Sequence, residues 1–136
     1  PVKVVLFVSS DAPDTDFTAK LIDEYPPTQD DPSGFAMNLT DGILRCRYRD
    51  SFESPAMMQP GETCCITIEV PPTANLFQAG HRIRLDIASS NFPKFDVNPN
   101  SGEPESEAAL KRVATNGVHM GTRHPSRVEL MGVWPS

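Results

Sequence analysis

Apolar and polar residues alternate along most of this chain with the two-residue period that is typical of β-strands. The clearest case is residues 16–25, where Phe17, Ala19 and Leu21 fall on one face and polar residues fall on the other. Residues 2–8 are almost wholly apolar, which predicts a central strand that is buried on both faces. The pattern therefore predicts a β-protein with at least one fully covered strand.

Further strands are expected at short intervals, separated by turns rich in proline and glycine. The chain has 14 prolines, which argue against long helices. We expect Asp41-Gly42 to form a turn, followed by a strand with Leu44, Cys46 and Tyr48 on its inner face. The other expected elements are strands over 35–37, 62–70, 82–89, 113–120 and 127–133, and a short helix over 105–112. This series predicts an all-β fold, an antiparallel β-sandwich or jelly roll.

The net charge of the chain limits the classes of molecule that it is expected to bind. The formal net charge is −6 and the sequence pI is about 4.9, which argues against nucleic-acid binding because that needs a concentrated positive field. The densest basic run, Arg45, Arg47 and Arg49, has the spacing of one strand face, and we expect it to be solvated. No apolar run approaches the ~20 residues of a membrane helix, so no membrane partner is expected.

The three cysteines cannot all pair within one chain, and no C-x-x-C motif is present. Unpaired thiols favour a reducing compartment, so we expect a cytoplasmic protein.

Few residues in this sequence suggest catalysis or metal binding. No serine lies in a G-x-S-x-G elbow, so no catalytic residue is expected in this chain. We interpret His81, His119 and His124 as surface or turn histidines, and Asp14 and Asp16 as turn-capping residues rather than calcium ligands. Neither a metal nor another cofactor is expected.

The stretch of residues 91–104 is long, irregular and rich in Asn, Pro and Gly. A segment of this length without secondary structure often has a function. Two phenylalanines among its polar residues suggest that it docks onto something; alternatively, both fold back and cap the core. The candidate residues of an inter-domain or substrate-facing loop are Asn91, Phe92, Phe95, Asp96 and Asn98.

Four stretches together point to a family. They are SSDAPDTDFTAKLIDEYP, MNLTDGILRCRYRDSF, PGETCCITIEVPPTANLFQAGHRIRLDIASSNFPKFDVNPNSG and HPSRVELMGV. In this order and spacing the chain resembles the C-terminal domain of the cocaine esterase / X-prolyl dipeptidyl-peptidase (CocE/NonD) family of serine hydrolases. The resemblance runs from Val2 to about Val133 and is weaker between Pro104 and Thr122.

The resemblance implies a jelly roll, similar in fold to galactose-binding domains, that packs on an upstream α/β-hydrolase domain. That domain supplies the Ser-Asp-His triad, and none of the triad positions maps onto this sequence. Members cleave X-Pro dipeptides or hydrolyse esters and amides. Because the chain starts inside an apolar strand, we expect residues 1–136 to be a single domain excised from a larger hydrolase, lacking its first strand or strands.

We therefore expect a non-catalytic C-terminal domain that stabilises the catalytic domain and helps to bound its substrate cleft. One alternative is a stand-alone carbohydrate-binding module. It is disfavoured because Trp134 is the only tryptophan and both tyrosines, Tyr25 and Tyr48, are expected on inward faces. The other alternative is an oligomerisation module, and a homo-oligomer is compatible with either role.

Overall fold

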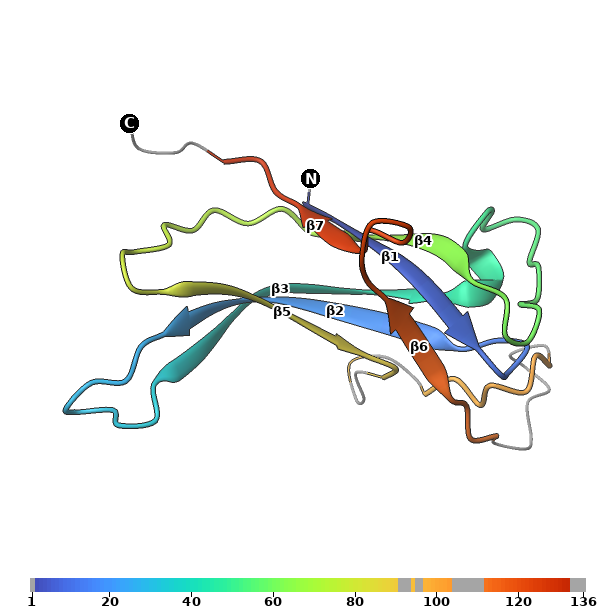
Figure 1. The fold of residues 1–136 in the computed structure, drawn as a ribbon, viewed down its shortest axis with the longest axis horizontal. Helices are drawn as coiled ribbons and strands as arrows, with labels where there is room; N and C mark the ends of the chain where they lie inside the picture. Colours follow the sequence, from blue (N-terminus) through green and yellow to red (C-terminus); the bar gives the residue numbers. More distant parts are fainter. Residues whose placement is uncertain (1, 91–93, 95–96, 104–111, 133–136) are drawn as a thin grey trace.

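Two antiparallel sheets lie face to face in the structure, a computed structural model that describes residues 2–90, 94, 97–103 and 112–132. Figure 1 shows the two layers from the side, with the hairpin between β2 and β3 extending beyond the other layer. The elements are β1 (Val2–Ser10), β2 (Asp16–Tyr25), β3 (Phe35–Arg45), a 3₁₀ turn η1 (Cys46–Tyr48), β4 (Cys64–Val70), β5 (Arg82–Ala88), β6 (Asn116–His119) and β7 (Arg127–Glu129). The predicted sandwich is thus confirmed.

The strand β1 is the central strand of the first sheet, as its sequence predicts. It pairs with β4 along one edge, from Val2 opposite Val70 to Val8 opposite Cys64. Along its other edge it pairs with β6 near its end and with β7 near its start. The second sheet covers one face of β1, where Val4, Leu6 and Val8 are no more than 2% exposed. On the other face Val5 is buried but Lys3 is exposed, so that face is only partly covered.

The second sheet has the order β3-β2-β5. The central strand β2 has the bounds that the alternation predicts, and its inward residues Phe17, Ala19 and Leu21 are each no more than 2% exposed. The predicted turn at Asp41-Gly42 is wrong, because β3 runs without a break and pairs Gly42 with Ala19. The predicted helix over 105–112 lies outside the described residues, apart from Arg112.

Gly42 has a packing role instead. A Cβ atom at this position would lie 2.8 Å from Cγ1 of Val70 and 3.2 Å from the carbonyl oxygen of Glu69, both on β4. Contacts of 3 Å and below are closer than van der Waals packing allows. The missing side chain therefore lets β3 approach β4 along one flank of the sandwich.

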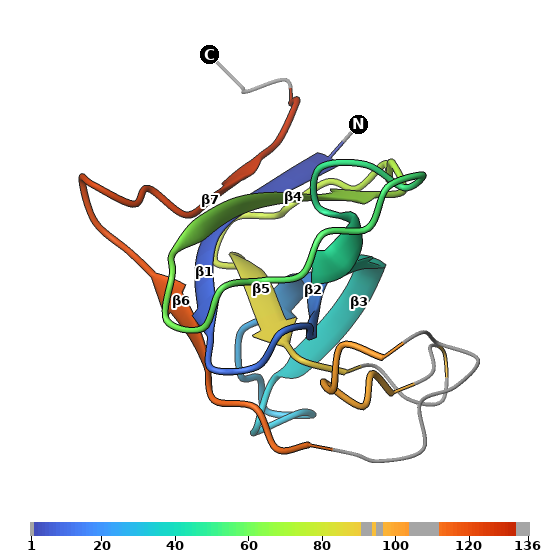
Figure 2. The ribbon, with the colours of Figure 1, turned by 90° about the vertical axis from the view of Figure 1, so that its right-hand side faces the viewer.

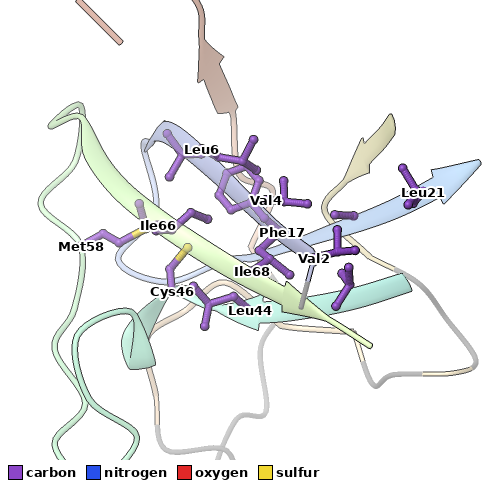
Figure 3. Close-up of a cluster of buried hydrophobic side chains, with 13 residues drawn as sticks. Val2, Val4, Leu6, Phe17, Leu21, Leu44, Cys46, Met58, Ile66 and Ile68 are labelled. Atoms are coloured by element: carbon purple, nitrogen blue, oxygen red, sulfur yellow. The ribbon is translucent and has the colours of Figure 1, made fainter. Parts of the chain in front are cut away.

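The hydrophobic core fills the space between the sheets. Figure 3 shows Val4, Leu6, Ile66 and Ile68 of the first sheet meeting Phe17 of β2. The whole buried cluster consists of Val2, Val4, Leu6, Val8, Phe17, Ala19, Leu21, Leu44, Cys46, Met58, Ile66, Ile68 and Val70. Alternate residues of facing strands thus build the core, as binary patterning requires.

Candidate functional site

Of the five candidate loop residues, Asn98 is the one that the structure describes; Asn91, Phe92, Phe95 and Asp96 lie outside the described residues. The Asn98 side chain is almost fully buried, 3% exposed. Its Nδ2 donates hydrogen bonds to Oδ2 of Asp14, at 3.0 Å, and to Oδ1 of Asp16, at 2.8 Å. The described part of the loop is therefore tied to the chain that leads into β2.

Two arginines neutralise these carboxylates. Arg45, the last residue of β3, binds Asp16 in a bidentate manner, with Nε–Oδ1 and Nη2–Oδ2 distances of 2.9 and 3.1 Å. Arg47 of η1 donates from Nε to Oδ2 of Asp14 at 2.8 Å and from its backbone nitrogen to Oδ1 at 2.9 Å. Charge-assisted pairs of this geometry are the strong ones. We call these five residues, Asp14, Asp16, Arg45, Arg47 and Asn98, the polar anchor.

The polar anchor corrects two predictions from the sequence. The expectation that Arg45, Arg47 and Arg49 share a solvated strand face is wrong, because β3 ends at Arg45 and the 3₁₀ turn breaks the alternation. As a result Arg47 is 5% exposed, and the Arg49 guanidinium donates to the carbonyls of Cys46, Ala56 and Met57.

The interpretation of Asp14 and Asp16 as turn-capping residues is also wrong. Both carboxylates are buried, at 0% and 1% exposed. Their hydrogen bonds within the described chain run to the two arginines and Asn98, residues distant in sequence. Only the tertiary fold brings these partners together.

The loop is held at further points. Nη2 of Arg47 donates to the carbonyl oxygen of Glu103 at 2.8 Å. The Asn98 Oδ1 accepts a hydrogen bond from the backbone nitrogen of Asn100, which adopts a positive φ of 63°. Earlier in the loop, Lys94 forms an ion pair with Asp41 of β3. The described residues of the loop therefore lie against the sandwich rather than extending freely from it.

The chemistry available to the polar anchor is limited. Its two carboxylates face two guanidinium groups, so their charges balance. Asn98 presents its NH₂ group to both carboxylates, which is the arrangement of a donor and not of a cation ligand. Within the described ranges, no group of three or more His, Cys, Asp or Glu side chains is placed to hold a metal ion. The polar anchor therefore serves to hold residues 97–103 against the sandwich.

Two pairs of side chains of the types found in a catalytic triad lie outside the polar anchor, one on each sheet. On the first sheet, Oγ of Ser9 and Nε2 of His119 are 2.9 Å apart. On the second sheet, Nδ1 of His81 and Oδ1 of the buried Asp23 are 2.8 Å apart. In the part of the chain that the structure describes, no hydrogen-bonded series joins a serine, a histidine and a carboxylate as a triad does.

His81 is more enclosed than the sequence suggests. Its side chain is 9% exposed and its ring lies 4.2 Å, centroid to centroid, from that of Tyr25. Asn75 donates to the second oxygen of Asp23 at 3.1 Å. The interpretation of His81 as a surface or turn histidine holds for its backbone, whose N–H closes a turn on the carbonyl oxygen of Gln78 at 3.0 Å. Its ring is in addition a partner of a buried carboxylate. The signal that could have identified it is Asp23, a charged residue on the apolar face of β2.

The thiols of Cys46 and Cys64 are not activated nucleophiles. All three cysteines are free. Burial, and next the nearby Cys64, raises the pKa of the Cys46 thiol. Burial likewise raises the pKa of Cys64. Because the thiolate is the reactive form, both side chains are less nucleophilic than an ordinary cysteine at neutral pH.

These features define an antiparallel β-sandwich domain with a buried polar anchor beneath one loop. Comparison with known proteins gives the family: the profile described as "X-Pro dipeptidyl-peptidase C-terminal non-catalytic domain" matches residues 1–129. The chain belongs to this family, and the resemblance seen in the sequence is confirmed. No helix in the described ranges is long and apolar enough to cross a membrane.

Similar proteins are considerably longer. The chain is 44% identical over 131 residues to a cocaine esterase of Rhodococcus sp. (strain MB1 Bresler), covering 95% of this chain and 22% of that protein. A crystal structure of an aminopeptidase from a marine sediment Thaumarchaeota archaeon is 30% identical, with a TM-score of 0.86. An α-amino acid ester hydrolase structure is 32% identical, with a TM-score of 0.84. Each comparison covers 93% of this chain and 22% of the solved chain, so this chain spans about a fifth of its relatives.

Proposed function

We propose that this domain belongs to a serine hydrolase of the X-Pro dipeptidyl-peptidase or acyl-ester hydrolase type, stabilises its catalytic domain and helps to bound its substrate cleft. The observation that carries the proposal is the match over residues 1–129 to a family of non-catalytic C-terminal domains. The similar proteins include an esterase, an ester hydrolase and an aminopeptidase. In this proposal an α/β-hydrolase domain, upstream in the same polypeptide, performs the chemistry.

The polar anchor supports the part of the proposal that concerns the cleft. A loop that contributes to a substrate site needs a fixed position, since a misplacement of about 1 Å can reduce the rate ~100-fold. Asn98 donates buried hydrogen bonds to the carboxylates of Asp14 and Asp16, and the carbonyl oxygen of Glu103 accepts a partly buried hydrogen bond from Arg47. The described part of the loop that the sequence singled out is thus tied to the sandwich by several hydrogen bonds.

Deletion tests the stabilising role. The full-length polypeptide encoded by the gene is compared with a version that lacks residues 1–136, using the melting temperature and kcat/KM for an X-Pro dipeptide amide and for an aryl ester. We expect the truncated protein to melt at lower temperature and to lose activity toward at least one of the two substrates. Unchanged stability together with unchanged activity would overturn the proposal.

Substitutions in the loop test its contribution to the cleft. Phe92→Ala and Phe95→Ala, each in the full-length polypeptide, should change KM or kcat/KM by about tenfold, which corresponds to about 1.4 kcal/mol. Leu76→Ala is the matched control, because Leu76 is 80% exposed and its segment lies at the opposite end of the sandwich from residues 97–103 (Figure 1). Equal effects of all three substitutions would show that the loop has no special role.

We further infer a reducing compartment, the cytoplasm. The support for this inference is that all three cysteines are unpaired. Mass spectrometry of the protein from its native source should find Cys46, Cys64 and Cys65 as free thiols, and a disulfide at any of them would contradict the inference.

A further inference from the structure

A pocket lies on the flank of the sandwich where β3 approaches β4. Its walls come from the end of β3, from η1 and the loop that follows it, and from the outer face of β4. Figure 2 shows η1 and this loop, both in green, beside β4. The volume of the pocket is about 290 Å³, close to the lower limit of small-molecule sites in proteins. The pocket is therefore large enough for a single side chain or a small ligand.

Two aromatic rings line the pocket. The rings of Tyr48 and Phe52 stack with their centroids 6.2 Å apart and their planes inclined by 28°. The expectation that Tyr48 lies on the inner face of a strand is wrong, because η1 replaces the strand there and Tyr48 lines the pocket. The Phe52 side chain is 81% exposed. Exposed aromatic side chains around a pocket are typical of ligand sites.

The polar groups of the pocket are mainly hydrogen-bond acceptors. The carboxylates of Asp50 and Glu69 line it, and within the described chain neither has a hydrogen-bond or ion-pair partner. Lys3 lies opposite Glu69 in the ladder of β1 and β4, but it also lies opposite Glu129 of β7. The Arg49 guanidinium, which belongs to the lining, donates to three backbone carbonyl groups. The pocket thus has more negative than positive charge, and its carboxylates are available to a donor.

The loop that carries Phe52 is held in a defined conformation. The hydroxyl of Ser51 accepts hydrogen bonds from the backbone nitrogens two and three positions later, at 3.1 and 3.3 Å. Further along, the backbone nitrogen of Ala56 donates to the carbonyl oxygen of Arg47 at 2.8 Å. Because the wall of the pocket is ordered beforehand, a ligand loses less affinity to the ordering of the loop.

We propose that this pocket binds the guanidinium group of an arginine side chain in a peptide. A guanidinium has five N–H donors and no acceptor, so it is complementary to the carboxylates of Asp50 and Glu69. It is also planar and less strongly hydrated than an ammonium group, so it stacks well on the rings of Tyr48 and Phe52. The inference does not depend on the proposed function, because it concerns a surface of this domain and not the hydrolase cleft.

A neutral sugar is the other class of ligand that stacks on aromatic rings. Sugar hydroxyl groups accept hydrogen bonds as well as donate them, so a sugar site needs donors. The donors of Arg49 in this pocket are directed to backbone carbonyl groups. The balance of donors and acceptors therefore favours the guanidinium group.

Three blocked amino acids test the proposal on the full-length polypeptide. They are N-acetyl-arginine amide, its neutral analogue N-acetyl-citrulline amide, and N-acetyl-lysine amide. Broadening of the ligand NMR signals should give a dissociation constant of about 1 mM for the arginine compound, a value typical of so small a ligand. The other two compounds should bind ~10-fold more weakly. Equal binding of all three, or binding of methyl glucoside in their place, would overturn the proposal.

Matched substitutions test whether the arginine compound binds in this pocket. Phe52→Ala and Glu69→Gln should each weaken its binding by about 5–10-fold. Phe35→Ala is the first control, since Phe35 is another exposed phenylalanine that contacts a tyrosine ring. Glu129→Gln is the second control, since Glu129 is the other carboxylate opposite the same lysine. Neither control residue lines the pocket, so both should leave the dissociation constant unchanged. All four side chains are exposed, so the variants should fold.

The remaining outcomes each contradict the proposal. Unchanged binding in Phe52→Ala and Glu69→Gln would show that the arginine compound occupies another site of the polypeptide, such as the substrate cleft. Equal losses in the pocket variants and their controls would show that the effect is not local to the pocket. An absence of binding to the folded full-length polypeptide would also overturn the proposal. None of these results bears on the proposed function, which the deletion of residues 1–136 tests separately.

Discussion

The guanidinium group of Arg47 and the carboxylate of Asp14 form an almost completely buried ion pair, with Nε and Oδ2 2.8 Å apart and side-chain exposures of 5% and 0%. The two residues are 33 positions apart in the sequence. Burial of both charges is costly, and such pairs persist where every donor and acceptor finds a partner. Here Asn98 and the carbonyl oxygen of Glu103 provide additional partners. The pair therefore couples three separate segments, and its loss should affect all of them.

Removal of one partner of the buried ion pair should strongly lower the stability of the fold. Asp14→Ala leaves the Arg47 charge buried without a counter-ion, and we expect the free energy of unfolding to fall by about 3–5 kcal/mol. Urea denaturation of the full-length protein measures this change. Asp86→Ala is the control, since the Arg84–Asp86 pair is exposed and its loss should leave stability close to that of the wild type. If Asp14→Ala and Asp86→Ala have similar free energies of unfolding, the buried pair contributes no more to stability than the exposed pair does.

Asn98→Leu should act locally. Leucine has a similar volume but donates no hydrogen bond, so Asp14 and Asp16 each lose one. We expect residues 97–103 to become more susceptible to proteolysis, with a stability loss of about 1–3 kcal/mol. Limited proteolysis followed by mass spectrometry locates the cleavage. Cleavage at wild-type rates in this segment would contradict the role of Asn98 in holding the loop.

Gly42→Ala tests whether the close approach of β3 to β4 depends on the absence of a side chain at this position. The added methyl group would meet Cγ1 of Val70 and the backbone of Glu69, and overpacking of this kind costs about 1–3 kcal/mol. Thermal unfolding should therefore show a lower melting temperature. Gly132→Ala is the matched control, because a Cβ at that position has no neighbour within 4 Å. If both substitutions are neutral, β3 and β4 do not depend on glycine for their approach.

The Cys46 thiol predicts a loss of stability in alkaline solution. Burial raises its pKa in the folded state above that of the unfolded chain. Its contribution is complete below the unfolded pKa, about 8.5, and is lost as the pH rises above that value, with a slope of about 1.4 kcal/mol per pH unit. Urea unfolding between pH 8 and 10 measures the slope. Cys46→Ala should show a shallower slope, and an identical slope would refute the prediction.

Local patterns were sufficient to predict much of the fold. The alternation in residues 16–25 gave the bounds of β2, and the apolar run in residues 2–8 predicted a central strand, because both signals depend on which faces are covered. The turn predicted at Asp41-Gly42 failed because a glycine serves equally for a turn and for close approach of another strand. Gly42 allows the close approach of β4, and nothing in the local sequence indicates that Val70 lies against it.

The candidate site was predictable only in outline. The unusual length of residues 91–104 drew attention to the segment that contains Asn98, and the part of this segment in a substrate cleft stays a prediction. The partners of Asn98 could not be identified, since Asp14 and Asp16 lie more than 80 positions away along the chain. The 3₁₀ turn that directs Arg47 inward has no clear local signal either. Long-range polar contacts of this kind depend on the completed sandwich.

The position of β1 at the centre of the first sheet has a consequence for biosynthesis. This strand leaves the ribosome first among the described elements, yet its partner His119 follows Ser9 by 110 residues. At ~5–20 residues per second the delay is roughly 5–20 s. During that time one edge of an apolar strand has no partner in the nascent chain. A chaperone that binds extended apolar segments would have its longest opportunity on residues 2–10, before the last strands are made.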